Sequence, residues 1–111
     1  MDISISLIET FKSKELWQWD KNRQIKIECE HNMQIEEVHF ENVYTDSALI
    51  VIPQKAETGE LIANIPDILL MHAVPIEIYI SSGICTNCRK TFKVNQRKKP
   101  SDHVYTETEI L

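Results

Sequence analysis

The stretch from Ala48 to Ser81 constrains the fold more than any other part of the chain. Its last part, Ile76–Ser81, alternates isoleucine with polar or amphipathic residues. A period of two is typical of a β-strand with one buried face and one wetter face. The run Leu49–Ile52 is apolar at every position, which predicts a strand covered on both faces. We therefore expect this stretch to form the middle of a small antiparallel β-sandwich.

Prolines and glycines in the same stretch predict where its strands end. Pro53 cannot donate a hydrogen bond to a neighbouring strand, so the strand before it should end, bulge or lie at a sheet edge. Glu57–Glu60 contains Gly59 and predicts a hairpin turn. Pro66–His72 is the only plausible helix, since proline is tolerated in a first helical turn. The predicted fold class is therefore all-β, with one short helix.

Shorter runs elsewhere supply the remaining strands. Ile3–Leu7, Ile25–Cys29, Ile35–Phe40 and Ile84–Val94 are each expected to be extended. The residues that share a parity within each strand should face inward. The predicted core therefore consists of Ile25, Ile27, Val38, Phe40, Leu49, Val51, Ile76, Ile78, Ile80, Phe92 and Val94.

Length and composition exclude several classes of protein. A chain of 111 residues makes one domain, which can bury a core without disulfides or metals. Three cysteines cannot pair completely, so a disulfide framework is not expected. No run approaches the ~20 apolar residues of a membrane span, and Met1–Glu9 lacks the features of a signal peptide. We expect a soluble protein that is made in a cytoplasm and has no membrane partner.

The charge of the chain is unevenly distributed. The net charge is −5, which disfavours phosphate binding, yet six of the twelve basic residues lie between Arg89 and Lys99. This basic run could bind nucleic acid, with Phe92 or Tyr105 stacking on bases. Alternatively, it is a solvated linker or a patch that docks on an acidic neighbour. The overall negative charge favours the second interpretation, so no nucleic-acid partner is expected.

Cys85 and Cys88 form the sharpest local motif. Two thiolates at this spacing on a tight turn can bind zinc from one side. A closed zinc site needs four ligands, and only Cys29 and His31 are obvious candidates for the other two. The alternative is that Cys85 and Cys88 are free thiols at the tip of a hairpin. We predict free thiols, with no metal and no cofactor.

No arrangement of residues predicts catalysis. The four histidines fall in different segments, and neither a Ser/His/Asp order nor a convincing carboxylate pair is visible. Gly59 and Gly83 are the only glycines, which excludes a glycine-rich phosphate loop. The chain is therefore not expected to be an enzyme. Trp17 and Trp19, which share a parity, are interpreted as core or core-rim residues rather than as an exposed anchor for a partner.

Residues 95–111 predict an extended arm that follows a domain of residues 1–94. Gln96–Asp102 is polar and contains Pro100, which disfavours a helix. Val104–Leu111 alternates but has no partner strand left in the domain, and an isolated strand gains order only by pairing. We expect the arm to add a strand to another copy or another protein. The expected contact residues are Val104, Tyr105, Thr106, Ile110 and Leu111.

Four short strings add a resemblance to this reading. They are Leu16–Asp20, Val38–Phe40, Ile65–Leu70 and Lys99–Ile110, of which the last is the most specific. In this order, over residues 15–111, they resemble a small N-terminal module of phage and prophage structural proteins from Gram-positive, mostly clostridial, hosts. The motif formed by Cys85 and Cys88 is not a feature of that family, which favours free thiols.

The resemblance implies the particle-proximal part of a tail-fibre or baseplate protein. The expected function is therefore that of a bacteriophage virion structural protein of the viral tail or baseplate, which anchors or joins other virion proteins. Such a protein would assemble in the host cytoplasm, reside in the virion and form a homo-oligomer. A head decoration or fibre-attachment protein and a zinc-stabilised binding module using Cys85 and Cys88 are the alternatives.

Overall fold

The computed structural model describes residues 3–9, 13–29, 35–82 and 85–101, and the side chains of residues 82–87 are outside this description. The described elements, in chain order, are β1 (Ile3–Leu7), β2 (Leu16–Trp17), β3 (Gln24–Cys29), β4 (Glu37–Glu41), β5 (Leu49–Val51), β6 (Gln54–Lys55), β7 (Leu61–Asn64), η1 (Asp67–Met71), β8 (Ile76–Ser82), β9 (Cys85–Phe92) and β10 (Val94–Asn95). The prediction of an all-β, antiparallel fold is confirmed.

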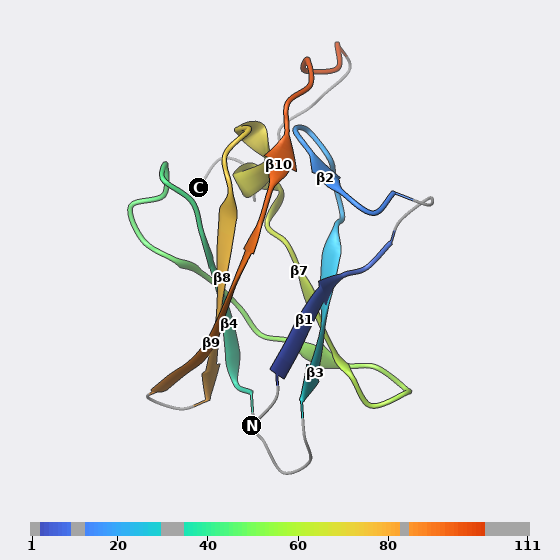
Figure 1. Ribbon diagram of the computed structural model, residues 1–111, viewed down its shortest axis with the longest axis vertical. Helices are drawn as coiled ribbons and strands as arrows, with labels where there is room; N and C mark the ends of the chain where they lie inside the picture. The colour runs from blue at the N-terminus through green and yellow to red at the C-terminus, as the bar shows by residue number, and fades with distance from the viewer. Residues whose placement is uncertain (1–2, 10–12, 30–34, 83–84, 102–111) are drawn as a thin grey trace.

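The strands form two four-stranded sheets, ordered β1-β3-β7-β6 and β5-β4-β8-β9 (Figure 1). Every pairing within these two sheets is antiparallel. A third, two-stranded pairing joins β2 to β10 in parallel. Because β2 lies in the connection between β1 and β3 of the first sheet, and β10 continues β9 of the second, this pair ties the two sheets together at one end.

One hydrophobic core receives side chains from both sheets. Eight of the predicted core residues are buried, namely Ile25, Ile27, Val38, Phe40, Ile76, Ile78, Ile80 and Val94. The other three, Leu49, Val51 and Phe92, are half-buried and pack against that cluster. The strand phases inferred from the period of two are therefore confirmed. The buried apolar residues that the pattern did not identify are Ile5, Leu16, Ala63, Ile65, Leu69 and Leu70.

The prediction that Leu49–Ile52 is covered on both faces is wrong. Strand β5 is the outermost strand of its sheet and pairs only with β4. Its alternate side chains Ile50 and Ile52 are exposed. An unbroken apolar run is typical of a central strand that is buried on both faces. Here it belongs to an edge strand that is exposed on one face. The expectation for Pro53 is confirmed, because β5 ends just before it and the chain continues as β6 in the other sheet.

The predicted hairpin is present, and the predicted helix is present as a 3₁₀ helix. The β6–β7 turn is closed by the Ala56 N–H, which donates to the Glu60 carbonyl at 2.8 Å. Gly59 has φ of +100° in this turn, a conformation that costs little only without a Cβ. The predicted helix is the 3₁₀ segment η1, whose first turn follows Pro66 and whose Leu69 and Leu70 are buried.

A buried arginine holds the connection between β1 and β3 in place. The guanidinium of Arg23 donates from Nη1 to Asp20 Oδ2 at 2.6 Å and to the Glu15 carbonyl at 2.9 Å. The same carboxylate oxygen of Asp20 accepts the N–H of Trp17 at 3.1 Å. One charged pair therefore fixes the loop that carries β2, although the loop contains only two strand residues.

The predicted boundary between residues 94 and 95 falls inside β10. The side chain of Asn95 donates to the Leu16 carbonyl at 3.1 Å and to Glu15 Oε2 at 3.2 Å. The N–H of Arg97 donates to Gln18 Oε1 at 3.0 Å. The first residues of the predicted arm therefore contact the domain. Residues 102–111 lie outside the described part of the chain, so the arm stays a prediction.

Candidate protein-binding surfaces

Exposed apolar side chains gather in one region of the chain. Among the described residues, five large apolar side chains are exposed, and four of them lie in β5, directly after it, or in the turn before it. Their exposed fractions are 79% for Val43, 62% for Tyr44, 55% for Ile50 and 66% for Ile52. Exposed apolar side chains that gather in one region commonly mark a contact site for another protein. We name this set of four residues the β5 patch.

Hydrogen bonds within the β4–β5 connection hold part of this patch. The N–H of Tyr44 donates to Asn42 Oδ1 at 2.8 Å, which makes an Asx turn. Thr45 Oγ1 donates to the Asn42 carbonyl at 2.9 Å, and its N–H donates to the same carbonyl at 3.2 Å. Asn42 is itself buried. The exposed position of Tyr44 therefore follows from a defined turn.

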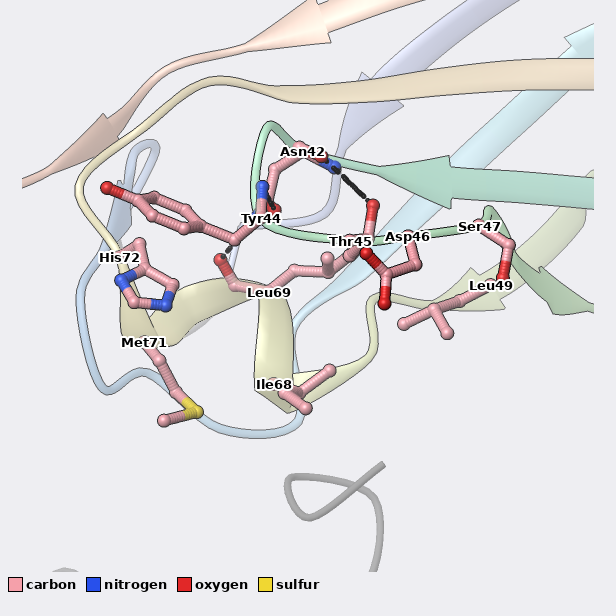
Figure 2. A pocket seen from close by; sticks show the side chains of 10 residues that line it. All are labelled: Asn42, Tyr44, Thr45, Asp46, Ser47, Leu49, Ile68, Leu69, Met71 and His72. Atoms are coloured by element: carbon pink, nitrogen blue, oxygen red, sulfur yellow. Dashed lines mark hydrogen bonds between the residues drawn. The ribbon is translucent and has the colours of Figure 1, made fainter.

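A groove of about 430 Å³ lies beside this turn (Figure 2). The rings of Tyr44 and His72 stack at one end of it, with centroids 4.0 Å apart and planes inclined by 24°. Ile68, Leu69 and Leu49 line the groove with apolar side chains. Its polar side chains come from the β4–β5 connection and are Asn42, Thr45, Asp46 and Ser47. The groove has the chemistry of a contact site for an apolar side chain with polar surroundings.

The outer face of the β5-β4-β8-β9 sheet carries polar groups that pair with one another. The Tyr79 hydroxyl donates to Glu77 Oε2 at 2.8 Å, and His39 Nε2 lies 3.5 Å from Glu37 Oε1. The hydrogen bond to Glu77 raises the pKa of Tyr79 above its ordinary value of 10.0, with a further contribution from Glu41. These groups satisfy one another and form no nucleophile–base pair.

The two tryptophans do not form the predicted core pair. Trp17 is exposed, Trp19 is half-buried, and their neighbour Leu16 is the buried residue. Trp19 has φ of +72°, and the ammonium of Lys99 lies 5.5 Å from the centroid of its ring. The interpretation as core is therefore wrong for Trp17. The shared parity did not predict burial here, because β2 contains only two residues and a loop follows it directly.

The structure places Cys85 and Cys88 in one strand, β9, rather than on a tight turn. Cys88 is half-buried, packs against the core and is a free thiol, as is Cys29 in β3. Within the described part of the chain, no group of three or more His, Cys, Asp or Glu residues could hold a metal ion. His31 and the side chain of Cys85 lie outside the described residues. The absence of zinc therefore stays a prediction.

The predicted partner-binding residues Val104, Tyr105, Thr106, Ile110 and Leu111 also lie outside the described part of the chain, so their role is untested. Sequence reasoning did not identify the groove between Tyr44 and His72. One signal was available, since Asn at the start of a loop commonly opens an Asx turn. The stacking partner comes from a segment 28 positions away, so no local pattern could indicate it.

The described residues include no helix with the length and apolar character that a membrane crossing needs. No family model, curated protein sequence or solved structure matches this chain.

Proposed function

We propose that this chain is a structural protein of a bacteriophage particle, in the tail or baseplate, where it joins other virion proteins. The β5 patch carries the joining role, because exposed apolar side chains at a sheet edge and in the adjoining β4–β5 connection are poorly suited to solvent and well suited to a protein contact. The resemblance of the four sequence strings to phage structural modules supports the placement in a virion.

The chemistry of the described surface agrees with a joining role. Polar groups on the outer face of the β5-β4-β8-β9 sheet contact one another, as the Tyr79–Glu77 and His39–Glu37 pairs illustrate. Open strand edges at β1, β5, β6 and β9 offer backbone groups to further strands. A partner that covers Ile50 and Ile52 would bury apolar surface and extend the sheet in one step.

The test is incorporation into particles. The chain is co-expressed with the tail and baseplate proteins of a bacteriophage, and purified particles are analysed by mass spectrometry and immunogold microscopy. We expect the wild-type chain in the tail or baseplate. Ile50→Ser together with Ile52→Ser should abolish its incorporation, whereas Gln54→Ser together with Lys55→Ser, on the exposed strand β6, should not.

Two results would contradict the proposal. One is the absence of the chain from particles in which the tail and baseplate are complete. The other is equal incorporation of the two double variants, which would remove the β5 patch from the contact. Thermal melting of both double variants shows whether they are folded. Neither should have a much lower melting temperature than the wild type, because both pairs of residues contribute little to the core.

A further inference from the structure

Strand β9 is the longest open sheet edge that the structure describes. The outermost strands are β1 and β6 in one sheet and β5 and β9 in the other. Strand β9 has eight residues, against five in β1, three in β5 and two in β6. An open edge presents unpaired backbone groups that can accept another strand. Strand β10 pairs with β2, so the available edge runs over Cys85–Phe92.

The register of β9 against β8 shows which side chains of β9 lie on each face of the sheet. Cys88 and Phe92 lie on the core side, where both pack against buried residues. Arg89 and Thr91 lie on the outer side and are exposed. Lys90 is exposed but shares the parity of Cys88 and Phe92, and its ammonium lies 5.9 Å from the centroid of the Phe92 ring. An added strand should therefore be apolar or small on its inner side and acidic on its outer side.

Residues 104–110 of this chain have that pattern. One side of the expected strand carries the β-branched residues Val104, Thr106, Thr108 and Ile110. The other side carries Glu107 and Glu109. In an antiparallel pairing with Ile110 opposite Cys88, Glu109 falls opposite Arg89. The other edges match less well, because β1 carries only serines between its apolar residues, and β5 and β6 are short.

The described residues after β10 contact the loop that carries β2. The N–H of Arg97 is held by Gln18 Oε1 at 3.0 Å, and Lys99 lies over the ring of Trp19. Figure 1 shows β9 running into β10, with the described residues after β10 continuing past it at the end of the molecule opposite the start of β9. A second copy of the chain can supply the strand.

We propose that residues 104–110 of one copy add an antiparallel strand to β9 of a second copy, with Glu109 beside Arg89. This inference rests on the proposed joining role and names a second copy as one of the joined proteins. Backbone hydrogen bonds between the two strands provide affinity. The alternation of charged and small side chains determines the register. It also covers the half-buried side chains of Cys88 and Phe92.

Full-length chains test the proposal by sedimentation. The wild type should self-associate at low ionic strength and less so as salt rises, because charge pairs at an exposed edge are screened. Arg89→Glu should raise the dissociation constant at least about tenfold, since like charges then face each other. Glu107→Arg together with Glu109→Arg should do the same. Lys55→Glu, an equal charge change on β6, is the matched control and should associate as the wild type does.

A mixing experiment shows whether the arm acts between copies. The Arg89→Glu chain and the Glu107→Arg, Glu109→Arg chain should each be monomeric alone and should associate when mixed. In the mixture, the reversed arm meets the reversed edge, and the native arm meets the native edge. Restored association supports the proposal, and a mixture that stays monomeric overturns it. A monomeric wild type at low salt, or equal association of Arg89→Glu and Lys55→Glu, overturns it as well.

The outcome is distinguishable from that of the proposed function. Incorporation into particles is measured with the Ile50 and Ile52 variants, whose β9 edge and arm are intact. Self-association is measured with purified chains, whose β5 patch is intact. A failure of one experiment therefore leaves the other result standing.

Discussion

Arg23 and Asp20 form a charged pair with an Nη1–Oδ2 distance of 2.6 Å, and Arg23 is only 4% exposed. The Arg23 Nε atom has no hydrogen-bond partner among the described residues, so this guanidinium depends on the bonds made by its other two nitrogens. Removing one partner of a buried pair leaves an uncompensated charge, which is far costlier than losing a pair on the surface.

Asp20→Ala is therefore expected to lower the free energy of unfolding by about 3 kcal/mol. The matched control is Lys26→Ala, whose ion pair with Glu28 lies at the surface and should contribute less than about 1 kcal/mol. Urea denaturation of both variants measures the difference. Equal and small losses would mean that Asp20 is not needed to compensate Arg23.

Phe40 is the largest fully buried side chain of the core, so its truncation should be among the most damaging substitutions. Phe40→Ala is expected to cost ~3–5 kcal/mol, because it removes apolar contacts and leaves a cavity. Ile50→Ala on the neighbouring strand is the control and should stay within ~0.5 kcal/mol of the wild type, since Ile50 is exposed. A loss below about 1 kcal/mol for Phe40→Ala would contradict the core assignment.

Tyr79 should introduce a pH dependence in the alkaline range. Its hydrogen bond to Glu77 raises the pKa of the phenol in the folded state above 10.0. The folded state therefore holds this proton more tightly than the unfolded state does. The resulting stability is fully present below about pH 10 and is lost as the pH rises through the folded pKa.

Two variants isolate this effect. Absorbance titration of the tyrosines should show a lower pKa for Tyr79 in Glu77→Gln, because the main cause of the shift is removed. The difference in unfolding free energy between the wild type and Tyr79→Phe should shrink only above about pH 10. A titration curve that Glu77→Gln leaves unchanged would show that the phenol is not coupled to this carboxylate.

Metal analysis of purified protein should find far less than one zinc ion per chain. This prediction follows from the strand position of Cys88 and its contact with the core, which suit a free thiol better than a ligand. Cys88→Ser should fold as the wild type does when no metal is added. Near-stoichiometric zinc that disappears together with the fold in Cys88→Ser would establish a metal site instead.

Truncation separates the first part of the predicted arm from the second. A chain that ends at Ser101 should melt almost as the wild type does, because its contacts with the domain are retained. A chain that ends at Asn95 loses the Arg97–Gln18 bond and the Lys99–Trp19 contact, and it should be less stable by about 1 kcal/mol. Both chains should lose self-association. Unfolding of the chain that ends at Ser101 would show that residues 102–111 belong to the domain.

Strands with a regular period of two could be predicted from the sequence. Burial that depends on tertiary contacts could not. Ile76–Ser81 alternates because β8 lies between two neighbours and one of its faces covers the core, so its phase could be read directly. Leu49–Ile52 was wrongly expected to be covered on both faces, because an apolar run does not reveal whether a strand is central or at an edge. Leu16 is buried because Arg23 and Asp20 fold its loop inward, which no local pattern expresses.

The candidate surfaces were less predictable than the core. The contact role of residues 104–111 rests on sequence patterns and stays a prediction, whereas Ile50 and Ile52 were expected to be covered because the run Leu49–Ile52 is apolar. The groove depends on the stacking of Tyr44 on His72, which are brought together by the position of η1 against the β4–β5 connection. A long-range contact of this kind has no signature in one sequence.

The parallel pairing of β2 with β10 determines how the domain responds to mechanical load. A force that pulls the start of β2 and the end of β10 apart runs along both strands in opposite directions. The bonds between them, such as that from the Gln18 N–H to the Asn95 carbonyl at 2.9 Å, are then loaded in shear and must break together. An antiparallel pair pulled in this way would open one bond at a time. We therefore expect the pair to resist extension of the chain along these two strands.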